Sequence, residues 1–322
     1  MAVPGKMSNF AAGVSLFHGN YMQFFRVIFS TFLNYLLFIM TRLRFLLALV
    51  IACVLGSLVP AQAQIIAVAD EHVNVDSLKR AFADTHYYFG LYRDNYFIFG
   101  PPIGPKPTVA NTNVKFQISI AQKLTKSTLP WGTYLYLYYT QKVFWNVLQN
   151  SMPMTDLNFN PGIGLAKPIF IKDRFIGKLN LQLEHESNGR DGEASRSWER
   201  ITIGGSVMVD PNFIVYGKFW IPFIDGVNNK DILKYCGIYQ IGWSFQTNDR
   251  KLSLGVTMVK RSGWNLNYNF TVEAAYRFST KSNQYLFAQY YNGYGEGLLD
   301  YKKYHSQLRV GIVIKPTLFS EY

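Results

Sequence analysis

The chain contains few cysteines and few charged residues. Only two of its 322 residues are cysteines, Cys53 and Cys236, so a scaffold held together by several disulfides is excluded. Charged residues make up 16% of the chain, whereas about a quarter is usual in soluble domains. Aromatic residues also make up 16%, and 49% of all residues are apolar, which excludes an intrinsically disordered chain.

Acidic residues are missing from the first 63 positions, which carry only four basic residues. The net charge of +12 for the whole chain therefore falls to +8 for the remainder. A net positive charge can favour binding to nucleic acid, to a membrane surface or to an acidic ligand. The sequence contains no basic helix and no RNA-binding motif, so we expect no nucleic-acid partner.

An export signal is predicted near the N-terminus. It begins at Met40 with a short basic segment, continues as an apolar run and ends at Ala61-Gln62-Ala63, a small-x-small cleavage site. We therefore predict a cleaved signal peptide within residues 1–63 and expect Met40 to be the true start. A transmembrane anchor is one alternative, because residues 45–69 carry no charge, and a lipoprotein site at Cys53 is another. We favour cleavage because the small-x-small site falls where the apolar run ends.

Beyond residue 90 no stretch approaches 18 apolar residues, and none keeps a helical period. Residues 252–258 instead alternate, with apolar side chains at even positions, and residues 308–314 largely repeat the pattern. Such alternation predicts strands with one apolar and one polar face. Twelve strand candidates follow one another near residues 95–101, 114–124, 133–145, 162–171, 177–187, 197–209, 213–223, 235–247, 251–260, 264–279, 284–293 and 305–315.

Twelve strands of about ten residues after an export signal predict an all-β fold, a twelve-stranded antiparallel transmembrane β-barrel. The alternative is a secreted soluble β-sandwich or lipocalin-like barrel, whose inward face is apolar. Three observations favour the membrane. Aromatic residues gather at strand ends, the chain ends in an aromatic residue, and large polar residues share one face, as a wet lumen requires. That polar face includes Lys178, Asn180, Gln182 and Glu184.

The most informative stretch is residues 179–190. Leucines occupy the odd positions 179, 181 and 183, so odd residues are predicted to face lipid. His185 and Ser187 are also odd, and polar groups on a lipid face are costly and therefore usually functional. Parity also places Glu199 of the next strand outward, beside His185 if the two strands form a hairpin. These side chains are the parts of a nucleophilic site. Taken alone, His185 and Ser187 could simply be polar residues in the lipid headgroup region. The shared outward parity of His185, Ser187 and Glu199 instead favours a catalytic role.

Residues 185–190, HESNGR, are followed by SRSW at residues 195–198. Together they resemble the active-site motif of the bacterial outer-membrane phospholipase A family. YTQK at residues 139–142 and GYGE at residues 293–296 resemble two further blocks of that family. The resemblance extends from about residue 90 to residue 319. The family fold is a twelve-stranded barrel, which agrees with the strand count.

The resemblance implies that Ser187 is the nucleophile and His185 the general base. It also implies that the backbone amide of Gly189 helps to build the oxyanion hole, a role that suits a fixed backbone donor. One position departs from the familiar pattern, because the third member of the triad is commonly asparagine and here it is Glu199. A carboxylate can orient the imidazole as well, and its charge strengthens the interaction.

The resemblance further implies a calcium ion as cofactor. Its ligands would be the Ser195 hydroxyl and the Arg190 carbonyl, with a serine of a partner barrel completing the site. Ser151 is the residue that we match to that serine. Hydroxyl, carbonyl and water oxygens are ligands that calcium prefers. Asp191 and Glu193 lie in the same loop and could screen or supplement the calcium site.

We therefore expect a calcium-dependent phospholipase of the bacterial outer membrane that hydrolyses acyl esters of phospholipids and lysophospholipids. The resemblance implies an active homodimer with Gln141 buried where two barrels meet, and the outward parity of Gln141 agrees. The predicted parts are the signal peptide (1–63), an N-terminal periplasmic segment (64–90) and the barrel (91–322). A non-catalytic porin or channel and a barrel that modifies lipid A are the alternatives. A porin would not need the outward catalytic residues, and a lipid A enzyme would leave the motif unexplained.

Overall fold

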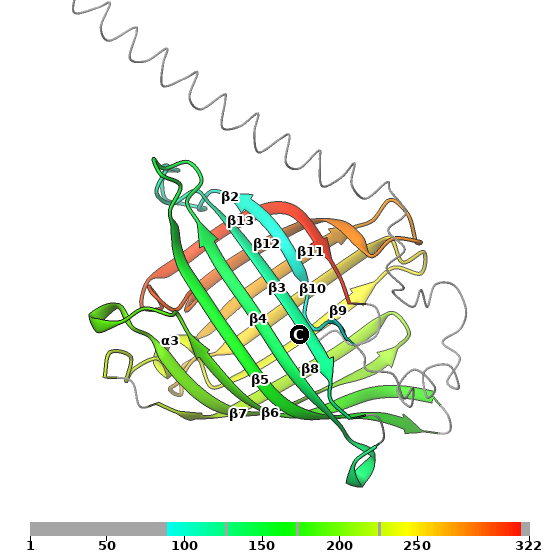
Figure 1. The fold of residues 1–322 in the computed structure, drawn as a ribbon. Helices are drawn as coiled ribbons and strands as arrows, with labels where there is room; N and C mark the ends of the chain where they lie inside the picture. Colours follow the sequence, from blue (N-terminus) through cyan, green and yellow to red (C-terminus); the bar gives the residue numbers. More distant parts are fainter. Residues whose placement is uncertain (1–88, 126–127, 172–173, 225–226, 317–322) are drawn as a thin grey trace, which may run out of the picture. The chain divides into compact units, whose positions relative to one another are not determined.

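The computed structural model describes residues 89–125, 128–171, 174–224 and 227–316 (Figure 1). All of them belong to the second of the two units into which the chain divides, residues 64–322. The predicted signal peptide, nearly all of the N-terminal periplasmic segment and the terminal aromatic residue lie outside the described residues and stay predictions. Among the described residues, no helix is long and apolar enough to cross a membrane.

The described strands form one antiparallel sheet that closes into a barrel (Figure 1). From β2 to β13 each strand pairs with the next, and β13 pairs with β2. The short β1 pairs with β3 alongside β2, so β1 and β2 act as one interrupted strand. The predicted twelve-stranded antiparallel barrel is therefore confirmed. The elements are β1 (Phe89–Leu91), β2 (Asn95–Gly100), β3 (Asn113–Lys123), η1 (Pro130–Gly132), β4 (Tyr134–Trp145), β5 (Met154–Ile171), β6 (Arg174–Ser187), η2 (Gly192–Ala194), β7 (Ser197–Asp210), β8 (Phe213–Phe223), α3 (Leu233–Cys236), β9 (Tyr239–Gln246), β10 (Leu252–Lys260), β11 (Tyr268–Tyr276), β12 (Gln284–Tyr294) and β13 (Tyr304–Ile314).

The strand limits differ from the predictions at three main places. β5 begins at Met154 rather than near residue 162, because the polar residues before Pro161 belong to a strand that faces a wet interior. β9 begins only at Tyr239, since the short helix α3 precedes it. β11 begins at Tyr268, because residues 261–267 form the preceding loop.

The two faces of the sheet carry the side chains that a membrane barrel requires. On β6, Leu179, Leu181 and Leu183 are 51, 46 and 53% exposed on the outer face. The intervening Lys178, Asn180, Gln182 and Glu184 are buried inside the barrel. A soluble β-sandwich or lipocalin-like barrel would carry the opposite arrangement, so the structure contradicts that alternative.

The HESNGR motif, residues 185–190, lies at the end of the barrel with the longer connections. Because neighbouring strands run in opposite directions, the β4–β5, β6–β7, β8–β9 and β12–β13 connections share this end. In outer-membrane barrels the longer loops are on the extracellular side, whereas the turns on the periplasmic side are short. The motif is therefore placed at the outer leaflet of the membrane.

The β12–β13 connection, residues 295–303, folds into the interior. Leu298 and Tyr301 are buried in a cluster with Trp198 and Trp220. Glu296 is also buried and forms ion pairs with two cations of the wall, Arg309 at 2.6 Å and Lys115 at 3.1 Å. Burial alone raises the pKa of the Glu296 carboxyl, but the two cations lower it to about 2. The β12–β13 connection therefore occupies part of the interior at this end, whereas an open porin keeps a water-filled channel.

Candidate active site

The β6–β7 hairpin brings His185 and Glu199 together. The two residues are direct partners in the register of these strands, so their side chains share the outer face. His185 Nδ1 lies 2.8 Å from Glu199 Oε1, and the side chains are 42 and 40% exposed. This is the contact that the shared odd parity of the two positions predicts.

Ser187 lies two residues after His185, on the same face and at the end of β6. Its direct partner on β7 is Ser197, and its partner on β5 is Phe159. In the part of the chain that the structure describes, no hydrogen bond joins the Ser187 hydroxyl to His185. Catalytic hydrogen bonds are often long or poorly aligned without substrate and tighten in the complex. Since Nδ1 faces Glu199, Nε2 is the ring nitrogen left for Ser187.

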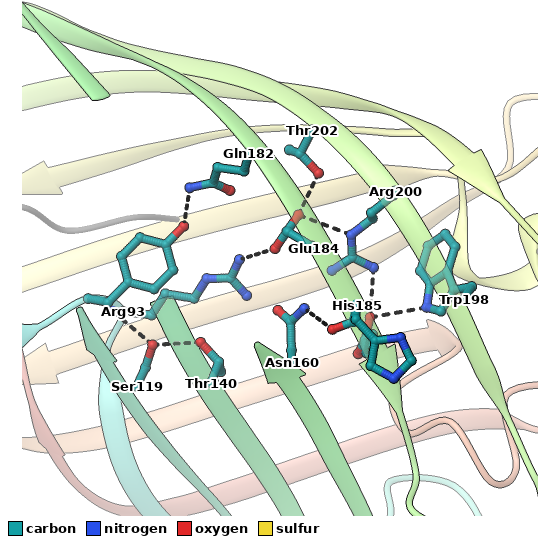
Figure 2. Close-up of polar contacts among 12 residues, drawn as sticks. Arg93, Ser119, Thr140, Asn160, Gln182, Glu184, His185, Trp198, Arg200 and Thr202 are labelled. Carbon is teal, nitrogen blue, oxygen red and sulfur yellow. Dashed lines mark hydrogen bonds and ion pairs between the residues drawn. The ribbon is translucent and has the colours of Figure 1, made fainter. Parts of the chain in front are cut away.

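A buried ionic network lies behind His185 and Glu199, on the inner face of the same hairpin (Figure 2). Arg200 Nε lies 3.1 Å from Glu184, and its terminal nitrogen lies 2.7 Å from Glu186. Trp198 Nε1 also donates to Glu186, at 3.2 Å, and Thr202 donates to Glu184. Because Arg200 reaches the residues on both sides of His185, the network ties β6 to β7 in the register that pairs His185 with Glu199. Sequence analysis missed this ionic network, although opposite charges at even positions of both strands could have indicated it.

Asn188 organises the loop between β6 and β7. Its side-chain oxygen accepts the backbone N–H groups of Arg196 at 3.0 Å and Arg190 at 3.3 Å. Its amide nitrogen donates to the Ala194 carbonyl at 2.9 Å, and the side chain is buried. Asn188 therefore fixes the shape of the loop that carries Gly189, Arg190 and Ser195. Sequence reasoning recorded this asparagine only as part of the motif.

Gly189 occupies a position that only glycine fits without a shift of its surroundings. Its φ of +63° lies in the left-handed region, which side chains disfavour. A Cβ at this position would lie 2.9 Å from Cε2 of Phe159. The backbone can therefore turn sharply next to Ser187, which is where an oxyanion-hole amide is needed.

The loop also contains the two oxygens assigned to a cation. Within the described residues, no hydrogen bond uses the Ser195 hydroxyl or the Arg190 carbonyl. The Arg190 guanidinium turns away to the Thr155 carbonyl at 2.7 Å, so its charge does not cover the loop. The described residues include no group of three His, Cys, Asp or Glu that could hold a metal. The two assigned donors, a hydroxyl and a backbone carbonyl, are oxygens of the kind that calcium prefers.

The residues assigned to dimerisation lie on neighbouring elements. Gln141 is on the outer face of β4, where the Tyr139 hydroxyl donates to its side-chain oxygen at 3.1 Å. The register runs from Gln141 to Phe159 and on to Ser187, so Gln141 is two strands away from Ser187. Ser151 is exposed in the β4–β5 loop, with a φ of +63°. Among the described residues, no hydrogen bond or ion pair joins Ser151 to the Arg190–Ser195 loop.

Comparison with known proteins gives consistent matches. The family model described as "Phospholipase A1" matches residues 101–314. Phospholipase A1 of Escherichia coli (strain K12) is 31% identical over 208 residues, which cover 62% of this chain and 69% of the relative. Phospholipase A1 of Proteus vulgaris is 29% identical over 205 residues, 62% of this chain and 69% of the relative.

Solved structures share the fold as well. Outer membrane phospholipase A from Escherichia coli matches with a TM-score of 0.62 and 26% identity, over 70% of this chain and 98% of that one. The Salmonella typhi outer membrane phospholipase, solved as a dimer with bound calcium, matches with a TM-score of 0.63 and 25% identity. That match covers 74% of this chain and 97% of the Salmonella chain.

Proposed function

The chain belongs to the phospholipase A1 family, and from this premise we propose that Ser187, His185 and Glu199 hydrolyse acyl esters of phospholipids and lysophospholipids at the outer membrane. The observation that carries the assignment of these residues is the 2.8 Å contact between His185 and Glu199 on the outer face, two residues from Ser187. A nucleophile, a base and an orienting carboxylate in this arrangement suit acyl transfer.

The reaction follows the order of a serine hydrolase. Ser187 Oγ attacks the ester carbonyl carbon while His185 Nε2 takes its proton. The tetrahedral intermediate then collapses, and the leaving alcohol of the lipid receives that proton from Nε2. Water, activated by His185 in the same way, hydrolyses the acyl-enzyme and releases the fatty acid. Glu199 holds the imidazole in one tautomer, and the Gly189 amide donates to the oxyanion.

The outward position of these residues explains how the substrate reaches them. Phospholipids in the same membrane can approach the outer face of β6 and β7 laterally. No passage through the barrel interior is required. The location of the site at the end of the barrel with the longer loops places it at the level of lipid headgroups, where the ester bonds lie.

Calcium is the cofactor of the reaction. The Arg190 carbonyl and the Ser195 hydroxyl would hold it, with Ser151 of a partner barrel as a further donor. The loop that Asn188 fixes presents the Arg190 carbonyl and the Ser195 hydroxyl from one short segment, residues 190–195, next to Gly189. A bound calcium ion would supply positive charge close to the developing oxyanion. The Salmonella relative that holds calcium is a dimer, which supports a homodimer as the active form.

A phospholipid-release assay tests the proposal directly. The full chain in detergent is expected to release fatty acid from phospholipid when calcium is present and to stop when a chelator is added. Ser187→Ala is the matched control, because it removes only the nucleophile. Release that survives Ser187→Ala would exclude Ser187 as the nucleophile, and release that survives chelation would exclude the calcium requirement.

A further inference from the structure

The pairing of β5 with β6 is interrupted opposite His185. It includes Phe159↔Ser187 and resumes at Gly162↔Glu184, so the same register places Pro161 opposite His185. On its other side β5 remains paired throughout this region, with Pro161 opposite Tyr139 of β4. Proline has no backbone N–H and cannot donate a hydrogen bond to a neighbouring strand. The backbone of His185 therefore lacks an ordinary donor from β5.

The side chain of Asn160 supplies a donor at this place. Its Nδ2 donates to the backbone carbonyl of His185 at 2.8 Å (Figure 2). Asn160 faces the interior and is only 7% exposed, so water competes poorly for this carbonyl. Buried backbone carbonyls almost always accept a hydrogen bond, and the Asn160 side chain supplies the donor for the His185 carbonyl.

A proline opposite His185 also has a use. Residues directly opposite each other on neighbouring strands have Cβ atoms about 4.5–5.5 Å apart, so the side chain at position 161 borders the imidazole from the β5 side. Glu199 borders it from the β7 side. The compact ring of Pro161 leaves room for the imidazole to stand beside the substrate, at the expense of one backbone hydrogen bond.

We propose that Asn160 is a positioning residue for His185, and that its amide replaces the backbone hydrogen bond that Pro161 cannot make. His185 is then held at two points, its carbonyl by Asn160 from inside the barrel and its ring by Glu199 on the outer face. This inference rests on the proposed function, in which His185 is the general base. Asn160 does not reach the outer face, so it acts on the rate of the chemical step and not on substrate binding.

Asn160→Leu tests this role, because leucine has a similar size and no donor. Displacement of a catalytic group by about 1 Å can cost about 100-fold, so we expect kcat to fall about 10- to 100-fold with KM within about twofold. The double variant Asn160→Leu/Pro161→Ala restores a backbone N–H opposite His185, and its kcat is expected to recover by at least about tenfold. Asn180→Leu is the matched control, since Asn180 is another buried asparagine on the inner face. It should leave kcat near that of the wild type.

All variants are compared per folded barrel, measured by the heat-dependent shift in gel mobility. If Asn160→Leu does not fold, Asn160→Asp takes its place, because an ionised carboxylate has the same shape and no donor. A kcat within twofold of the wild type for the Asn160 variant, or a double variant no faster than the single one, would overturn the inference. The proposed function fails separately, if the wild type releases no fatty acid or Ser187→Ala remains active.

Discussion

Replacement of Glu199 separates the two contributions that its carboxylate makes to His185, a hydrogen-bond acceptor and a negative charge. Glu199 Oε1 lies 2.8 Å from His185 Nδ1. A hydrogen bond to a charged group contributes about 1.5–3 kcal/mol, and the pair lies toward the lower end because solvent screens half-exposed charges. At about 1.4 kcal/mol per tenfold change in rate, a contribution of about 1.5–2 kcal/mol means that Glu199→Ala is expected to lower kcat about 10- to 30-fold. The corresponding loss in a buried protease triad is about 10⁴-fold, larger because that site is dry.

Glu199→Gln keeps an acceptor oxygen of the same reach and removes only the charge. We expect it to lose about fivefold or less, in keeping with the smaller contribution of neutral hydrogen bonds. The assay is the release of fatty acid at saturating phospholipid with calcium, and circular dichroism confirms that each variant is a folded barrel. Asp210→Ala is the control, because Asp210 is an exposed acidic residue at the opposite end of β7. If Glu199→Ala turns over as fast as the wild type, Glu199 does not orient His185 and another group must do so.

Three further predictions concern the nucleophile, the dimer and the loops. Ser187→Ala should abolish hydrolysis and leave a folded, heat-modifiable barrel; near wild-type turnover in this variant would contradict the assignment. Chemical crosslinking of the dimer should increase with calcium, since a ligand shared by two barrels favours the dimer, and Ser151→Ala should weaken that increase. A monomer that is active without calcium would contradict the shared calcium site. Partial burial raises the pKa of the Asp231 carboxyl, but hydrogen bonds from Tyr301 at 2.5 Å and Lys302 at 2.9 Å outweigh it and leave the pKa below its ordinary value. The stability that this contact provides is therefore present above about pH 4 and is lost as the pH falls through the lowered pKa. Asp231→Asn should lower the Tm at neutral pH, and its Tm should approach that of the wild type at about pH 2. An equal difference in Tm at both pH values would exclude this contribution of Asp231.

Alternation in the sequence was sufficient to predict the barrel and the outward face of the catalytic residues. The side chains of a strand alternate between its two faces, so the leucines of β6 indicate which residues face lipid. His185 has the same parity as these leucines and therefore also faces outward. The pairing of His185 with Glu199 needed only the further assumption that these two consecutive strands form a hairpin. Both inferences depend on residues that are close in sequence.

The residues that support the site from a distance could not be predicted in this way. Asn160 reaches His185 from β5, and the hydrogen bond depends on a register that the sequence does not state. The predicted strand began near residue 162, after Pro161, whereas β5 begins at Met154 and continues through this proline. The strand pattern does not indicate that the β12–β13 connection folds inward, where Leu298 donates its backbone N–H to Asn158 of β5 at 3.1 Å. Such contacts arise only once the barrel has closed.

The hairpin that carries His185 and Glu199 has side chains of two different kinds on its opposite faces. The outer face holds His185 and Glu199 among leucines, whereas the inner face holds Arg200 between Glu184 and Glu186. A slip of one residue between β6 and β7 would exchange the two faces, bringing charges into lipid and leucines into the wet interior, and both changes are unfavourable. The slipped register would also break the ion pairs of Arg200, which are buried and expensive to lose. The alignment of His185 with Glu199 is therefore held by residues that never meet the substrate, and an exposed site can keep its geometry without being enclosed.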